Sequence, residues 1–219
     1  MNILINKLPR TVQIGGIEIL INTDFRTSIE FEELIKNYDL EDDEQRKEFW
    51  DNALKLYYPI LNIDFNESTI EEKNLFNYVI DNVGEAINQI MWFYRCGNEC
   101  IKNTENQKTS KEEIYNFIYD EPTIFASLMQ QYGINIRQEN LHWWDFKAYF
   151  DNLNEDTEMR KIMSIRATDL SKIKDKDMKE YYRKLKRAHK IPLPEDEEGV
   201  DSKELEILMH GGNFSKLNK

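Results

Sequence analysis

The side chains that most often carry catalysis or bind metals are scarce in this sequence. Three histidines are present, at positions 142, 189 and 210. Glu139 and His142 have the Glu-x-x-His spacing of di-iron helical bundles, which on a helix places both side chains on one face. Such a centre needs a second Glu-x-x-His and two further glutamates, and the sequence contains no second copy of the motif. We therefore interpret the pair as a coincidence and predict no metal site.

The other candidate pairs are equally incomplete. Cys96 and Cys100 are one helical turn apart and lack the Cys-x-x-Cys spacing of zinc or redox sites, so we expect ordinary half-buried thiols. Glu206 and His210 lie four residues apart in the C-terminal segment, where we expect them to be solvated. The glycine motifs of dinucleotide and phosphate binding and the Gly-x-Ser-x-Gly elbow are absent. These observations predict a binding protein that is not an enzyme and has no cofactor.

A basic run is the strongest charge feature. Between positions 172 and 190 it contains three acidic residues and nine basic ones, namely Lys172, Lys174, Lys176, Lys179, Arg183, Lys184, Lys186, Arg187 and Lys190. Such a run could contact nucleic acid. The alternative is a solvated helix face that docks on acidic regions of its own chain or of a partner. An acidic run follows at 195–198, a combination that is common on helices and favours the alternative.

The aromatic run at 141–150 offers a second kind of binding chemistry. The Trp143-Trp144 pair could form a binding platform, although aromatic residues at helical spacing more often belong to a core, and one tryptophan could face each way. The basic run has a narrow apolar stripe of its own, at positions 178, 181, 182 and 185. From the two segments together we predict the following partner-binding residues: Trp143, Trp144, Phe146, Phe150, Tyr181 and Leu185.

Bulk composition limits the classes of protein to which the chain can belong. Its 219 residues suit one medium domain, or a core domain with appendages, and the 12% aromatic content supplies bulky core material. The net charge of -12 argues against general binding to nucleic acid, because a polyanion would be repelled. Two cysteines cannot form a disulfide framework, and the sequence has neither a signal peptide nor a run of membrane-spanning length. We therefore expect a cytoplasmic protein with no membrane contact.

The first secondary-structure element that the sequence predicts, counting from the N-terminus, is a β-hairpin. Residues 11–14 and 17–20 alternate apolar and polar side chains on either side of Gly15-Gly16, and two glycines supply the positive φ angles of a tight turn. An isolated hairpin is only marginally stable in water, so we expect it to pack on helices. Packing on another chain is the alternative.

Helical periodicity dominates the sequence from residue 24 onward. The first helix has Thr23 or Asp24 as its cap, and Pro59 ends the second. The longest predicted helix starts after Ser68 or Thr69, runs about 40 Å at 1.5 Å per residue, and stops at Gly97. Beyond a polar loop at 102–111 we predict further helices at 113–119, at 120–132, over the aromatic run, after an Asn154 cap, and at 175–189.

The predicted fold is therefore mainly α, a helical domain with a small N-terminal β-hairpin. We divide the chain into a hairpin segment at 1–22 packed on the helical domain, the helical domain itself at 23–191, and an acidic tail at 192–219. The tail begins where Pro192 and Pro194 break the last helix, and we expect it to be mobile.

Several segments resemble the bacteriophage "gene product fifteen" family. INTDFRTSI at 21–29, directly after the glycine-turn hairpin, looks like the opening of that family. LHWWDFKAYF at 141–150, followed by KIMSIR at 161–166, looks like its second half, and the LHWW-x-F run is the most specific element. Tyr119-Asp120, the run IFAS at 124–127 and Tyr132-Gly133 also fit. The resemblance covers residues 1–194 with the segments in matching order, and the tail matches nothing.

The resemblance implies a protein similar to the tail assembly chaperones of long-tailed phages of Gram-positive hosts. Such a protein would act in the host bacterial cytoplasm, coat the tape measure protein during assembly, and leave before the tail matures. The implied partners are the tape measure protein and the major tail tube protein, with self-association as a further option. A structural tail or neck component of the particle is the alternative, and a DNA-packaging accessory that uses the basic run is a third hypothesis.

Overall fold

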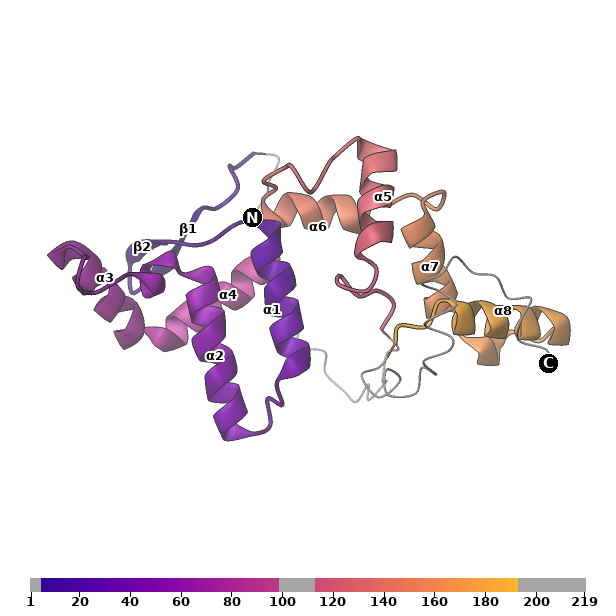
Figure 1. The fold of residues 1–219 in the computed structure, drawn as a ribbon, viewed down its shortest axis with the longest axis horizontal. Coiled ribbons are helices and arrows are strands. Elements are labelled where there is room, and N and C mark those ends of the chain that lie inside the picture. Colours follow the sequence, from indigo (N-terminus) through magenta and orange to yellow (C-terminus); the bar gives the residue numbers. More distant parts are fainter. Residues whose placement is uncertain (1–4, 99–112, 193–219) are drawn as a thin grey trace, which may run out of the picture. The chain divides into compact units, whose positions relative to one another are not determined.

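The computed structural model describes residues 5–98 and 113–192 (Figure 1). Among these residues it contains eight α-helices and an N-terminal antiparallel hairpin of two strands, which confirms the predicted mainly helical fold. The chain forms two compact units. The first unit comprises residues 1–109 and 122–157, and the second unit comprises residues 110–121 and 158–219. The predicted boundaries after residues 22 and 191 stay predictions.

The N-terminal hairpin packs on a helix of the first unit. Strands β1 (Thr11–Ile14) and β2 (Ile17–Leu20) pair in antiparallel register, with Val12 opposite Ile19, and Gly15 and Gly16 have φ angles of 57° and 86°, as the sequence predicted. The Gly15 amide donates to the Glu85 carboxylate over 2.7 Å. The Tyr78 hydroxyl donates to the Gly15 carbonyl over 2.8 Å. A side chain at Gly15 would collide with this hydroxyl. The turn therefore needs glycine at this position, both for the positive φ angle and because no side chain fits there.

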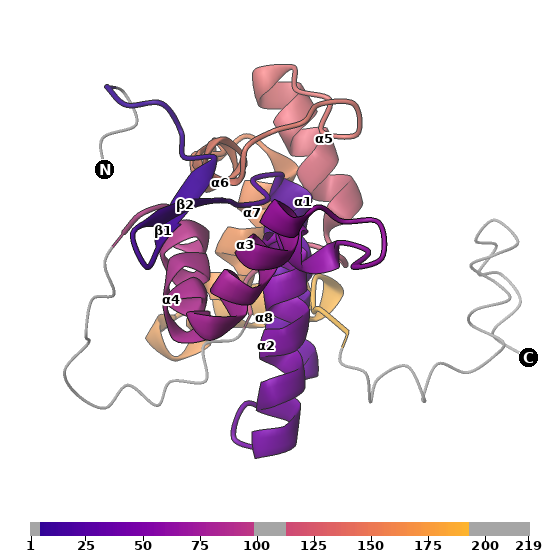
Figure 2. The ribbon, with the colours of Figure 1, turned by 90° about the vertical axis from the view of Figure 1, so that its left-hand side faces the viewer.

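The first unit, whose helices are labelled in Figure 2, has a core rich in aromatic side chains. Its helical elements are α1 (Phe25–Asn37), α2 (Asp43–Tyr57), the 3-10 helix η1 (Pro59–Asn62), α3 (Ile70–Asp81), α4 (Val83–Tyr94), α5 (Glu121–Tyr132, except its first residue) and α6 (Trp143–Asp151). Several predicted boundaries are confirmed. Asp24 caps α1, Thr69 and Glu72 form a capping box at α3, and Gly133, with φ 68°, follows the end of α5.

The predicted 40 Å helix is wrong, because the chain breaks into α3 and α4 at Asn82. This residue has φ -114° and ψ 32°, and its side-chain amide donates to the Tyr78 carbonyl over 2.9 Å. Asn favours such local side-chain bonds over continued helix. The two halves then contact different elements, α3 packing on η1 and α4 on β1, and the hairpin turn binds residues on both sides of the break. The continuous apolar stripe concealed this break.

Two further helix predictions need correction. Residues 113–119 contain no helix, because Asn116 Oδ1 accepts the amides of Ile118 and Tyr119 at 2.9 and 2.8 Å and closes a turn instead. The helix predicted to start after an Asn154 cap is α7 (Glu158–Ala167), which begins four residues later. The backbone carbonyl of Asn154 accepts from the amide and the hydroxyl of Thr157, at 3.0 and 2.7 Å, in a turn that precedes the helix.

The second unit is built on α7, the short 3-10 helix η2 (Leu170–Lys172) and α8 (Lys176–Ala188). Helix α8 is capped by Asp175, whose side chain accepts from the Met178 amide at 2.7 Å, so the prediction of a helix at 175–189 is confirmed within one residue at each end. Helices α7 and α8 pack against each other. Across the described ranges 5–98 and 113–192, no helix is long and apolar enough to cross a membrane.

Candidate functional site

The aromatic residues predicted for α6 lie in the core of the first unit. Trp143, Trp144, Phe146 and Phe150 are each exposed by 2% or less. Phe146 stacks on Phe25 of α1 with a centroid distance of 4.6 Å. These contacts bind α6 to the rest of the first unit, so the packing role of the aromatic run is observed, while its partner-binding role stays a prediction.

Both indoles face inward, so the idea that one tryptophan faces each way is wrong. Trp143 Nε1 donates to the Tyr94 carbonyl, and Trp144 Nε1 donates to the Phe93 carbonyl, each over 2.8 Å. These two carbonyls lie at the C-terminal end of α4, where the last turn of a helix leaves carbonyl groups without partners in the helix. The indole N–H groups therefore cap α4. Trp144 also lies against Gly97, where a Cβ would come within 2.9 Å of its ring, and Gly97 has φ 75°.

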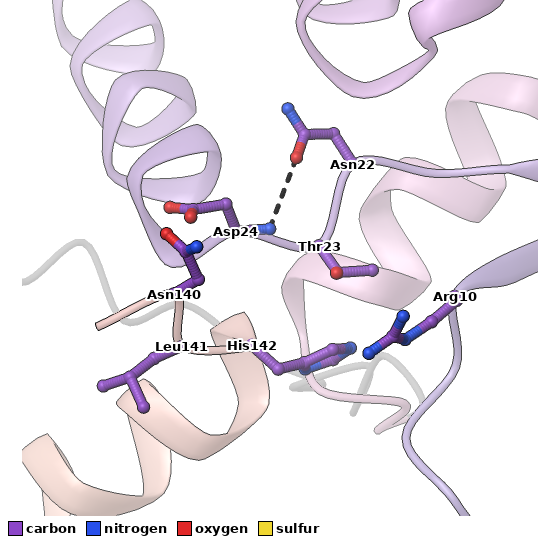
Figure 3. Close-up of a pocket in the computed structure, with 7 residues that line it drawn as sticks. All are labelled: Arg10, Asn22, Thr23, Asp24, Asn140, Leu141 and His142. Atoms are coloured by element: carbon purple, nitrogen blue, oxygen red, sulfur yellow. Dashed lines mark hydrogen bonds between the residues drawn. The ribbon is translucent and has the colours of Figure 1, made fainter. Parts of the chain in front are cut away.

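A small pocket of about 290 Å³ lies where two distant segments of the first unit cross (Figure 3). The segments before α1 and α6 form an isolated antiparallel bridge at Asp24 and His142. The Phe25 amide donates to the Leu141 carbonyl over 3.0 Å, and the Trp143 amide donates to the Thr23 carbonyl over 2.8 Å. The pocket is lined by Arg10, Asn22, Thr23, Asp24, Asn140, Leu141 and His142. Sequence reasoning missed this pocket because it forms only when the two segments meet.

His142 is the only histidine in this pocket, and both of its ring nitrogens are engaged. Nδ1 accepts the Trp144 amide at 3.1 Å, which caps α6. Nε2 lies 2.9 Å from the Pro9 carbonyl, and since a carbonyl only accepts, Nε2 must carry the proton. Burial lowers the pKa of His142 and outweighs the hydrogen bond to Pro9 and the charge of Asp145, which raise it. A neutral ring with no vacant nitrogen cannot serve as a general base, so we interpret His142 as a structural residue.

The other polar groups of the pocket also hold the crossing together. The Asp24 carboxylate accepts the Arg26 amide at 2.9 Å and pairs with the Arg26 guanidinium at 3.0 Å. The same guanidinium donates to the Ile136 carbonyl over 2.6 Å. Asp24 therefore links the start of α1 to the loop before α6. This arrangement favours a structural junction over a catalytic site.

The structure also changes the geometry expected for the candidate metal and thiol residues. Glu139 lies in the loop before α6 and His142 is the N-cap, so the two do not share a helical face. Within residues 5–98 and 113–192, no three His, Cys, Asp or Glu side chains are placed to hold a metal ion. Burial raises the pKa of the Cys96 thiol to about 11, so the thiol stays protonated near neutral pH. Cys100, Glu206 and His210 lie outside the described residues.

Helix α8 presents the predicted binding residues that reach the surface. None of its side chains is fully buried, and Met178 and Tyr181 are exposed by 48% and 55%. Leu185 is half-buried, and the Tyr181 and Tyr182 rings lie 5.6 Å apart. The Lys186 ammonium donates to the Thr168 carbonyl over 3.1 Å, which holds the helix near the end of α7. The predicted site residues therefore divide between a buried set in the first unit and an exposed set on α8.

The lowered pKa of His142 predicts that acid destabilises the first unit. Because the unfolded chain binds the proton more tightly than the folded protein does, stability is complete above the ordinary pKa of 6.5. Stability is then lost as the pH falls from 6.5 toward the folded pKa. His142→Asn keeps a side-chain oxygen for the helix cap but cannot titrate. Urea unfolding at several values between about pH 7.5 and 5.5 should show a steeper loss for the wild type than for this variant.

His189 and His210 are present in both proteins, so the difference between the two pH profiles isolates His142. Parallel profiles for the wild type and the variant would contradict this prediction. A constant offset between such parallel profiles would mean that the substitution weakens only the helix cap.

Comparison with known protein families identifies a match that covers most of the chain. The Bacteriophage Gp15 protein family matches residues 4–191, which span both units up to the end of α8. Comparisons with curated proteins and with solved structures gave no match. The matched range includes the hairpin, the aromatic run and the basic helix, and it leaves the acidic segment after residue 191 outside. On this evidence, the chain belongs to the Bacteriophage Gp15 protein family.

Proposed function

We propose that this phage protein is a tail assembly chaperone, which binds and solubilises the tape measure protein and helps to recruit tail tube subunits. The observation that carries the proposal is the exposed apolar stripe of α8, where Met178 and Tyr181 stand among basic side chains. Of the predicted partner-binding residues, we assign this role to Tyr181 and Leu185. The four aromatic residues of α6 are buried and support the fold.

The chemistry of the partner suits this surface. A tape measure protein is a very long helical protein, and its apolar stripe would aggregate before the tail tube encloses it. An amphipathic helix can cover such a stripe by laying its own apolar face against it. The net charge of -12 on the chaperone would keep the complex in solution. Contacts through a few partly exposed side chains are weak enough for tube subunits to displace them later.

The double variant Met178→Ser/Tyr181→Ser tests this assignment. We expect co-purification with the tape measure protein of the same phage to fall about tenfold or more, because a tyrosine at the centre of an interface often contributes 2 kcal/mol or more. The protein would be co-expressed with the tagged tape measure protein, and the soluble complex quantified after affinity capture. Ile70→Ser is the matched control, because Ile70 is 76% exposed on α3 and lies in the other unit.

Two outcomes would contradict the proposal. If the tape measure protein is equally soluble with and without this chain, and the two never co-purify, the chaperone function is wrong. If both variants co-purify like the wild type, the assignment to α8 is wrong. Mass spectrometry of purified particles separates the chaperone from a structural tail or neck component, because a chaperone that leaves is absent from mature virions.

A further inference from the structure

Helix α8 and the residues beside it contain many more basic than acidic side chains. Residues 172–190 include nine basic and three acidic side chains, a net charge of +6. Within the helix, Arg183 pairs with Glu180, one of those three acids. The apolar stripe lies between these charges, and every described side chain of α8 keeps part of its surface exposed. A helix face that combines positive charge with exposed Met178 and Tyr181 attracts an acidic segment that also carries apolar residues.

The same chain contains a segment with this complementary composition. Residues 195–206 include seven acidic side chains and one lysine, which gives a net charge of -6. This charge is equal in magnitude and opposite in sign to that of residues 172–190. Ile207, Leu208 and Met209 follow directly. The family match ends at residue 191, so this segment is an addition to the part of the chain that the family shares.

The connection between the two segments is long enough for contact within one molecule. Helix α8 has 13 residues and is therefore about 20 Å long. Six residues lie between Ala188 and Glu195, so the chain takes seven steps of up to about 3.5 Å each and can span roughly 25 Å. A chain that turns back after Pro192 and Pro194 would bring its acids first to Lys184, Arg187 and Lys190. Its apolar residues would then reach Met178 and Tyr181 near the start of the helix.

We propose that the acidic segment 195–209 docks on the basic, apolar face of α8 in the same molecule. The covalent connection raises the effective concentration of the segment at this face to about the millimolar range, so weak contacts suffice for occupancy. The docked segment covers the surface that the chaperone proposal assigns to the tape measure protein, and a partner must displace it. The contact itself does not require that function, so each proposal can fail without the other.

Hydrogen exchange of the full chain without any partner tests the docking. In one variant, the acidic run is neutralised by Glu195→Gln, Asp196→Asn, Glu197→Gln and Glu198→Gln. A control variant removes the same number of charges from exposed positions of the first unit by Glu41→Gln, Glu44→Gln, Asp51→Asn and Glu67→Gln. We expect the amides of α8 to exchange about threefold faster or more in the first variant only, because loss of the covering segment eases local opening.

A charge reversal makes the test specific. Lys184→Glu with Arg187→Glu should also speed exchange in α8, and the addition of Glu195→Lys with Glu198→Lys should restore the slow exchange. Identical exchange in the neutralised variant and the wild type would overturn the proposal. Protection that disappears on tenfold dilution would assign the contact to a second copy of the chain and would overturn docking within one molecule.

Discussion

Replacing Arg166 by methionine is expected to lower the free energy of unfolding of the second unit by about 3–5 kcal/mol, because it leaves a buried carboxylate without its partner. Arg166 and Asp120 are exposed by 5% and 4%, and the guanidinium binds both carboxylate oxygens, at 2.6 and 2.9 Å. The guanidinium also donates to the carbonyls of His189, at 2.6 Å, and Ile114, at 3.3 Å. One side chain on α7 therefore holds the end of α8 and the turn at 117–120.

Urea unfolding followed by circular dichroism would measure this loss, and hydrogen exchange would place it in α7 and α8. Arg183→Met is the matched control, because the Arg183–Glu180 pair is about half exposed, and such pairs contribute only about 0–1 kcal/mol. Asp120→Asn combined with Arg166→Met removes both charges and should recover part of the stability. Equal effects of Arg166→Met and Arg183→Met would contradict the role assigned to the buried pair.

Replacing Trp143 by alanine is expected to cost about 3–5 kcal/mol of stability in the first unit, as large-to-small substitutions in a core do. The indole is fully buried, stacks on Tyr94 with an interplanar angle of 8°, and caps the end of α4 through its N–H. Thermal and urea unfolding would measure the change. Trp143→Phe keeps a ring in the core and loses the hydrogen bond, so its cost should be clearly smaller.

Tyr181→Ala separates the core from the proposed binding surface. Tyr181 is 55% exposed, so its removal should change stability by less than about 1 kcal/mol while it weakens capture of the tape measure protein. A Trp143→Ala protein as stable as the wild type would contradict the packing role. Such a result would return the aromatic run to the candidates for partner binding.

The sequence predicted local features well because short-range chemistry determines them. The glycine pair at 15 and 16 indicated the hairpin turn, since positive φ angles favour glycine wherever they occur. Asp24, Thr69 and Asp175 indicated helix starts, because a capping side chain binds an amide two or three residues ahead. The sequence also predicted that α8 has a largely exposed face, because its apolar stripe is narrow and its charged residues lie within one helix.

The candidate sites depended on contacts between residues that are distant in the sequence. The sequence showed that the aromatic run was apolar, but only the arrangement of α1, α4 and α6 decided that both indoles face inward. The longest predicted helix breaks at Asn82, and the hairpin turn binds residues on both sides of the break. The spacing of apolar residues every three or four positions does not indicate this contact. His142 follows the spacing of a metal ligand, yet the Pro9 carbonyl and the Trp144 amide occupy both of its nitrogens.

By itself, the sequence determined the helical class, the hairpin, most helix starts and the family resemblance, because these follow from spacings of a few residues and from the order of short motifs. Only the tertiary structure decided which of those residues are accessible. Arg166 and Asp120 lie 46 positions apart and form a buried pair, while Tyr181 remains on the surface. Periodicity within one element indicates which of its faces is apolar, but burial also depends on which other elements pack against that face.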